Sequence, residues 1–170
     1  REKEFHFDER VLQLGQNVYL KGYFQSEKYF LPAKEIIRKD FTFKRDVVQN
    51  IEEFSSTFKA SNAVSIHIRR GDFSKDSMTT GYHGIPGTEY YNVAIDLLKS
   101  KIPDPTFYLF SDDINWVKEN LQVQNAIYVS NNITNSPAED LYLMSQCKHN
   151  IIANSSFSWW GAWLNNNPDK

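Results

Sequence analysis

Residues 63–68 read Ala-Val-Ser-Ile-His-Ile, and the polar residues Arg-Arg-Gly-Asp follow at 69–72. A short apolar run without helical spacing, followed by a polar loop that contains glycine, predicts a buried strand. Three further short apolar segments occupy 106–110, 126–129 and 150–153. Because helix-like patterns separate them, the sequence predicts an α/β fold, a Rossmann-like parallel sheet flanked by helices.

Helices are expected between these strands. Tyr91, Ile95 and Leu98 have the spacing of one helical face, which predicts a helix from a cap at Thr88 to about Lys101. The other helices are expected at 46–59, 111–120, 137–147 and from about 157 onward.

The first 45 residues are expected to form a lead-in segment of hairpin and helix that packs on the domain of residues 46–170. Residues 18–24 read Val-Tyr-Leu-Lys-Gly-Tyr-Phe, and this aromatic and β-branched composition predicts a strand. The length of 170 residues suits one compact domain with such a small appendage.

Composition excludes some classes of function. The net charge of −2 argues against nucleic-acid binding. The single cysteine, Cys147, cannot form an intramolecular disulfide, and a buried thiol is favoured over a reactive one. No apolar run approaches the ~20 residues of a membrane span.

The polar segments that follow the strands are the candidate site. Ligands of open parallel sheets bind outside the carboxyl ends of the strands, which places 67–72, 111–113 and 154–158 on one rim. Since strand residues alternate between faces, His67 and Arg69 are expected to point the same way.

Two adjacent arginines, Arg69 and Arg70, end the first strand. A guanidinium at this place must reach water or an anion, and its planar fork matches the oxygens of a diphosphate. The alternative is an internal salt bridge, for example of Arg70 with Asp72 or with Asp112. The six-residue pattern at a sheet rim favours the anion site.

Residues 154–158 (Asn-Ser-Ser-Phe-Ser) stand where the last helix begins. Small polar groups at the positive end of a helix dipole favour an anion, although a simple helix cap would explain one of them. The tryptophans that follow, Trp159, Trp160 and Trp163, are interpreted as core packing rather than as a sugar platform.

The carboxylates allow two interpretations each. Asp112 and Asp113 could hold a metal ion, but they are adjacent and lack a third ligand, so capping by Ser111 or Asp112 is favoured. Asp140 lies in the first turn of its helix, where the dipole favours it; equally, it could accept hydrogen bonds from a ribose or a guanine edge.

Four motifs together resemble those of the glycosyltransferase family 11 fucosyltransferases, the α-1,2 enzymes. They are Gly-Tyr-Phe-Gln-Ser-Glu-Lys-Tyr-Phe at 22–30, His-Ile-Arg-Arg-Gly-Asp at 67–72, Phe-Ser-Asp-Asp at 110–113 and Asn-Ser-Ser-Phe-Ser-Trp-Trp-Gly at 154–161. The resemblance implies a GT-B fold and an inverting, metal-independent transfer of fucose from GDP-fucose to the 2-hydroxyl of a galactose-terminated acceptor. It also implies a cytoplasmic or membrane-surface location for a bacterial enzyme, and the Golgi lumen for a eukaryotic one.

The resemblance also implies residue roles. Arg69 would contact the β-phosphate and Asp72 would be its catalytic partner, with Asp76 as an alternative base; the base could equally belong to an N-terminal acceptor domain, for which this sequence shows no counterpart. The expected contacts of GDP-fucose are His67, Arg69, Arg70, Asp112, Asp140, Asn154, Ser155, Ser156, Phe157 and Ser158.

Rival interpretations remain open. A transferase for another GDP-sugar would share these motifs, and the 170 residues alone could act as a nucleotide-sugar-binding module without activity. A phosphoacceptor receiver domain would explain Asp112 and Asp113 but would require a lysine after a later strand, where Ala153-Asn154-Ser155 has none.

Overall fold

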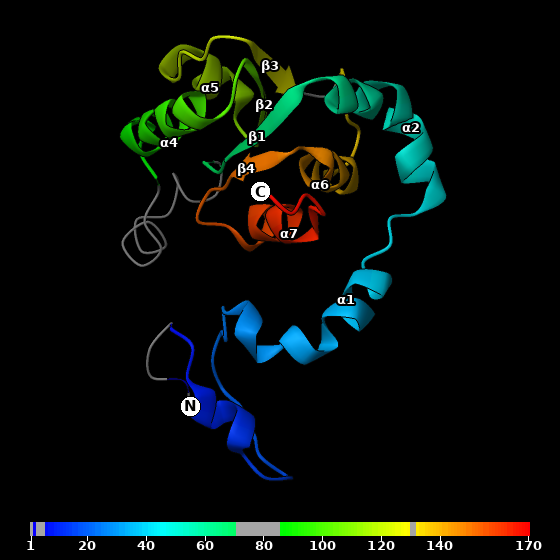
Figure 1. Cartoon of the computed structure of the whole chain (residues 1–170), viewed down its shortest axis with the longest axis vertical. Coiled ribbons are helices and arrows are strands. Elements are labelled where there is room, and N and C mark those ends of the chain that lie inside the picture. The colour runs from blue at the N-terminus through cyan, green and yellow to red at the C-terminus, as the bar shows by residue number, and fades with distance from the viewer. Residues whose placement is uncertain (1, 3–5, 71–85, 130–131) are drawn as a thin grey trace. The chain divides into compact units, whose positions relative to one another are not determined.

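The computed structural model describes residues 2, 6–70, 86–129 and 132–170. The chain divides into two compact units, residues 1–42 and 43–170 (Figure 1). The boundary expected from the sequence was between 45 and 46.

The larger unit contains a four-stranded parallel sheet with the order β3-β2-β1-β4. The predicted strands are confirmed, with shifts of one or two residues at some ends. Ile68 at the end of β1 pairs with Ser111 at the end of β2, so the polar segments after both strands start at the same level. The strands are β1 (Asn62–Ile68), β2 (Pro105–Ser111), β3 (Ala126–Val129) and β4 (His149–Ile151).

Helices cover both faces of this sheet, as the sequence predicts (Figure 1). Alternate residues of β1 enter different cores: Val64 and Ile66 pack against α4 and α5, and Ala63 faces α2 and α6. The fold is therefore of the Rossmann-like α/β class. The helices are α2 (Arg45–Ser56), continued by a 3-10 turn (Thr57–Ala60), α4 (Thr88–Lys101), α5 (Ile114–Asn120), α6 (Pro137–Gln146) and α7 (Ser156–Leu164).

Helix α4 has the predicted length and inner face, with Tyr91 and Ile95 buried. The predicted cap is wrong by one residue. Gly87 occupies the N-cap position without a side-chain hydrogen bond, and Thr88 is the first helical residue.

Helix α7 packs closely on α6. A Cβ atom at Gly161 would lie 3.0 Å from the Cβ atom of Met144, so a larger residue would push the helices apart. The tryptophans of α7 pack on one another: Trp159 and Trp163 stack with ring centroids 6.3 Å apart, and Trp163 is buried. This agrees with core packing.

The smaller unit has the 3-10 turns Glu9–Gln13, Glu27–Tyr29 and Leu31–Ala33 and the helix α1 (Lys34–Asp40). The strand predicted at 18–24 is wrong. Phe24 has a φ of 48°, which interrupts an extended chain, and the Glu2 carboxylate accepts the backbone N–H groups of Tyr23 and Phe24. These amides bind a side chain in place of a partner strand.

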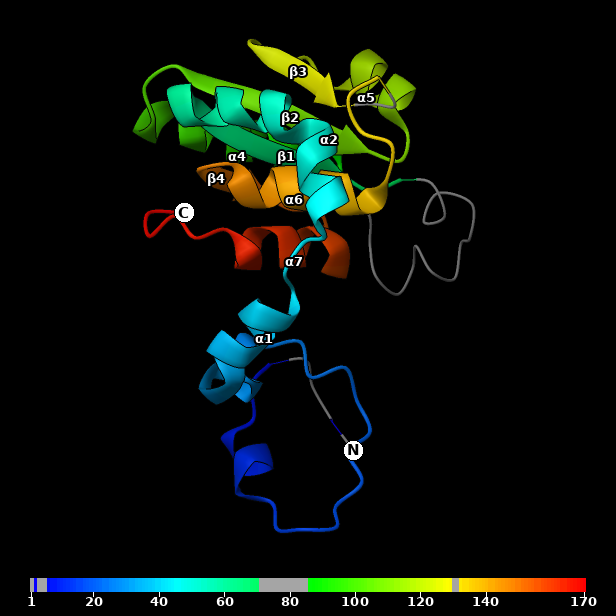
Figure 2. The ribbon, with the colours of Figure 1, turned by 90° about the vertical axis from the view of Figure 1, so that its right-hand side faces the viewer.

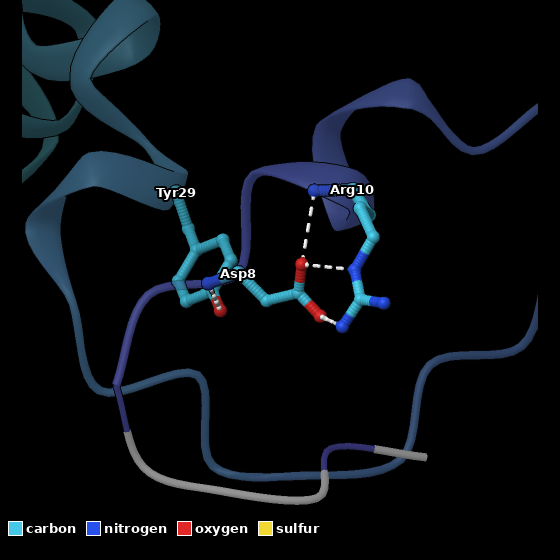
Figure 3. Close-up of polar contacts among 3 residues, drawn as sticks. All are labelled: Asp8, Arg10 and Tyr29. Atoms are coloured by element: carbon cyan, nitrogen blue, oxygen red, sulfur yellow. Dashed lines mark hydrogen bonds and ion pairs between the residues drawn. The ribbon is translucent and has the colours of Figure 1, made fainter.

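Figure 3 shows how the turn at Glu9–Gln13 begins. The Asp8 carboxylate accepts the backbone N–H of Arg10 at 3.1 Å and also pairs with the Arg10 guanidinium at 2.8 Å. The Tyr29 hydroxyl accepts the backbone N–H of Asp8 at 2.8 Å, which ties two turns of this unit together (Figure 3). No helix among the described residues has the length and apolar character of a membrane span.

Candidate functional site

The carboxyl ends of the strands meet at one edge of the sheet. The arrowheads of β2 and β3 point to this edge, and α6 and α7 begin on the same side (Figure 2). The segments at 67–70 and 111–113 include the ends of β1 and β2, and 154–158 follows the end of β4. This is the rim expected from the sequence.

Asp112 joins the two strand ends. Its Oδ1 atom accepts the backbone N–H of Arg70 at 2.8 Å, and its Oδ2 atom lies 3.2 Å from Nη1 of Arg69. The salt bridge proposed from the sequence between Arg70 and Asp112 is therefore made by Arg69, while Arg70 contributes its backbone amide. The structure brings three predicted site residues together.

The cap of α5 differs from the prediction. The Asp113 carboxylate accepts the backbone N–H of Trp116 at 3.1 Å, and the Ser111 hydroxyl accepts the backbone N–H of Asp113 at 3.0 Å. Neither Ser111 nor Asp112 caps the helix, because Asp112 is turned toward the arginines. Asp113 is therefore the structural carboxylate of the pair.

Arg70 stacks on Trp116. The guanidinium carbon lies 3.8 Å from the centroid of the indole ring, which is cation–π geometry. Sequence reasoning missed Trp116; an aromatic residue in the first turn of a helix that starts at the rim was the available signal.

His67 is buried under this rim, with 5% of its surface exposed. Its ring centroid lies 5.5 Å from that of Phe157 in α7, and its backbone carbonyl accepts the Tyr91 hydroxyl at 3.2 Å. Burial lowers the pKa of His67 to about 4; the Asp112 charge opposes this shift and the Arg69 charge adds to it. The imidazole is neutral at neutral pH.

The start of α7 has no side-chain cap. Ser155 occupies the N-cap position without a side-chain hydrogen bond, Asn154 and Ser156 are exposed, and Phe157 is half-buried. Ser158 is buried, and its hydroxyl lies within hydrogen-bonding distance of the carbonyls of Ala153 and Ser155. Ser158 therefore secures the helix start from inside, while the exposed residues face solvent.

Asp140 lies in the first turn of α6, behind the Ser136 cap. Burial raises the pKa of Asp140; a hydrogen bond with Thr134 opposes this shift and the Glu139 charge adds to it. Glu139, which the sequence did not single out, is buried and accepts the backbone N–H of Asn135 at 2.6 Å. Glu139 thus holds the loop before α6 from within, and Asp140 keeps one carboxylate oxygen, Oδ1, without a hydrogen bond among the described residues.

Within the described residues, three buried side-chain polar atoms have no hydrogen-bond partner: Nδ1 of His67, Nε of Arg70 and Oδ1 of Asp140. All three belong to residues predicted as ligand contacts. Buried polar atoms in folded proteins are rarely left unpaired, and each exception calls for a reason such as a ligand. Asp72 and Asp76 lie outside the described residues, and the part that is described contains no cluster of three metal-binding side chains.

A sequence model of the family described as Glycosyl transferase family 11 matches residues 5–169. The chain belongs to glycosyl transferase family 11.

Curated relatives come from bacteria and animals. The chain is 40% identical over 150 residues to an alpha-1,2-colitosyltransferase of Escherichia coli, covering 85% of this chain and 50% of that protein. It is 35% identical over 164 residues to the O-antigen biosynthesis glycosyltransferase WbnK of Escherichia coli, covering 94% and 54%. It is 26% identical over 157 residues to galactoside alpha-(1,2)-fucosyltransferase 2 of Sus scrofa, covering 88% and 46%. The chain spans about half the length of these relatives.

Proposed function

We propose that this chain is the donor-binding part of an α-1,2-fucosyltransferase, which moves fucose from GDP-fucose to the 2-hydroxyl of a galactoside. The observation that carries the proposal is the set of buried polar atoms on His67, Arg70 and Asp140 that have no hydrogen-bond partner among the described residues. At one rim, His67 can donate a neutral hydrogen bond, Arg70 can donate a charged one, and Asp140 can accept one. A nucleoside diphosphate has phosphate oxygens for the first two and base or ribose groups for the third.

The charge at the rim supports diphosphate binding without a metal ion. As the bond between the fucose carbon and the β-phosphate oxygen breaks, negative charge grows on GDP and positive charge on the sugar. The fixed guanidinium of Arg69, which Asp112 orients at 3.2 Å, would stabilise the departing diphosphate. The uncapped start of α7 adds the positive end of its dipole.

His67 and Asp140 have separate parts in this proposal. The neutral imidazole of His67 donates a hydrogen bond from Nδ1 to a phosphate oxygen. The Asp140 carboxylate accepts hydrogen bonds from the guanine or ribose side. The base that takes the acceptor proton is assigned to Asp72 or Asp76, or to the remainder of a longer protein.

A second candidate is transfer of a colitosyl group. The relative with 40% identity is named an alpha-1,2-colitosyltransferase, and the fucosyltransferase relatives are 26–27% identical. Both candidates use the same rim and differ in the sugar. We therefore propose that GDP binds at this rim and that fucose is the transferred sugar, with colitose as the alternative.

Titration calorimetry with GDP, UDP, GDP-fucose and GDP-mannose tests the proposal. We expect GDP and GDP-fucose to bind the 170-residue chain in the presence of a chelator, and UDP to bind at least about tenfold more weakly because Asp140 has no guanine partner. Equal binding of UDP would exclude a guanine contact for Asp140 and leave the ribose, which UDP shares with GDP, as its partner. Tighter binding of GDP-mannose than of GDP-fucose would contradict fucose as the transferred sugar.

A further inference from the structure

Arg70 is held at two points that the family motif alone does not explain. Its backbone N–H is bound to Oδ1 of Asp112 at 2.8 Å, and its guanidinium carbon lies over the Trp116 ring, 3.8 Å from the ring centroid. Its Nε atom is buried and lacks a hydrogen-bond partner within the described part of the chain. The guanidinium is therefore placed over the indole ring, while its Nε donor has no acceptor among the described residues.

Trp116 is itself rigidly placed. It lies in the first turn of α5, its backbone N–H is bound by the Asp113 cap at 3.1 Å, and its ring packs against the core that α4 and α5 share with the sheet. A ring held in this way limits the positions that a guanidinium lying over it can take. An arginine that is ordered before a ligand arrives loses less conformational entropy when it binds.

We propose that Trp116 is a positioning residue of the donor site, which holds the Arg70 guanidinium over its ring so that the N–H groups of Arg70 meet a diphosphate oxygen. This inference rests on the proposed function, because it requires a diphosphate at the rim. In this arrangement the two arginines are oriented by different side chains. Asp112 orients Arg69, and the indole of Trp116 orients Arg70.

The test compares Trp116→Leu with Trp116→Phe, because leucine keeps apolar bulk and phenylalanine also keeps an aromatic face. We expect Trp116→Leu to weaken GDP binding about 3- to 30-fold, and Trp116→Phe to stay within about threefold of the wild type. Guanosine, which has no phosphate, should bind both variants as it binds the wild type. A general distortion of the rim would weaken the binding of guanosine as well.

The coupling between the two residues gives the second readout. In an Arg70→Ala background, Trp116→Leu should have no further effect on GDP affinity. Arg70→Lys keeps the positive charge but loses the planar guanidinium that lies over the ring. It should therefore weaken GDP binding about as much as Trp116→Leu does. Because Arg70 is only half-buried, this variant tests the inference even if Trp116→Leu fails to fold.

The inference is overturned if Trp116→Leu or Arg70→Lys binds GDP like the wild type. It is also overturned if Trp116→Leu weakens the binding of guanosine and of GDP equally. The same holds if Trp116→Leu still weakens GDP binding in the Arg70→Ala background. A wild-type chain that binds no GDP would overturn the proposed function together with this inference. A wild-type chain that binds GDP beside unchanged variants would overturn the inference alone.

Discussion

The Asp112 carboxylate accepts the backbone N–H of Arg70 at 2.8 Å and so ties the end of β1 to the end of β2. Its second oxygen pairs with the Arg69 guanidinium at 3.2 Å. One side chain thus fixes the chain path and orients a cation. These two roles can be separated by substitution.

Asp112→Ala should lower the free energy of unfolding by about 1–2 kcal/mol, because the Arg70 amide loses its partner. Asp112→Asn keeps an oxygen for that amide and loses the ion pair, which is partly exposed and should contribute less than about 1 kcal/mol. Urea unfolding followed by circular dichroism measures both. An equal loss of unfolding free energy in the two variants would show that the hydrogen bond from the Arg70 backbone N–H to Asp112 is not the stabilising contact.

His67 should make stability depend on pH. The pKa of His67 is about 4 in the folded chain, below its ordinary value of 6.5, so the unfolded chain binds the proton first as the pH falls. The contribution is fully present above pH 6.5 and decreases as the pH falls toward 4. Between pH 7.5 and 4.5 the wild type should lose about 2 kcal/mol more than His67→Gln, measured by urea unfolding at each pH. Parallel losses in the two proteins would exclude a buried neutral His67.

Asp140→Asn should have opposite effects on stability and binding. Burial raises the pKa of Asp140, so its ionised form at neutral pH costs stability that a neutral amide avoids. We expect a higher melting temperature at pH 7.5 and GDP binding weaker by about tenfold or more. Asp96→Asn, an exposed change on α4, is the control and should alter neither quantity. Lower stability together with unchanged GDP affinity in Asp140→Asn would contradict the assignment.

Cys147 should be inert in the folded chain. It is 1% exposed, and burial raises the pKa of its thiol, so little reactive thiolate is accessible. Alkylation by iodoacetamide should be more than about a hundredfold slower in buffer than in denaturant. Comparable rates would mean that the region around α6 opens readily.

Much of the fold was predictable because the pattern of the larger unit is consistent at every level. The strands around Ile66, Leu109 and Val129 are short apolar runs separated by helical spacing, and the structure places each where the pattern predicts. The rim followed from the rule for parallel sheets. His67 could be named in advance because a polar residue near the end of an apolar strand has few other reasons to be there. Asp140 could be named from its place in the first turn of a helix, although the helix dipole explained it equally well.

Other features depended on contacts between distant residues. The strand predicted at 18–24 fails because Glu2 binds the amides of Tyr23 and Phe24, which no local composition reveals. The exchange of roles between Asp112 and Asp113 follows from the approach of the arginines of another strand. Trp116 was missed for the same reason, since its partner Arg70 lies far away along the chain.

We propose that Arg69 binds a GDP diphosphate at this rim without a metal ion. Calorimetric titration of GDP in chelator, with the wild type, Arg69→Ala and the exposed control Arg45→Ala, tests it most directly. We predict saturable binding by the wild type and the control, and at least about a tenfold loss in Arg69→Ala with folding unchanged. Unchanged affinity in a folded Arg69→Ala, or wild-type binding only after magnesium or manganese is added, would contradict the account.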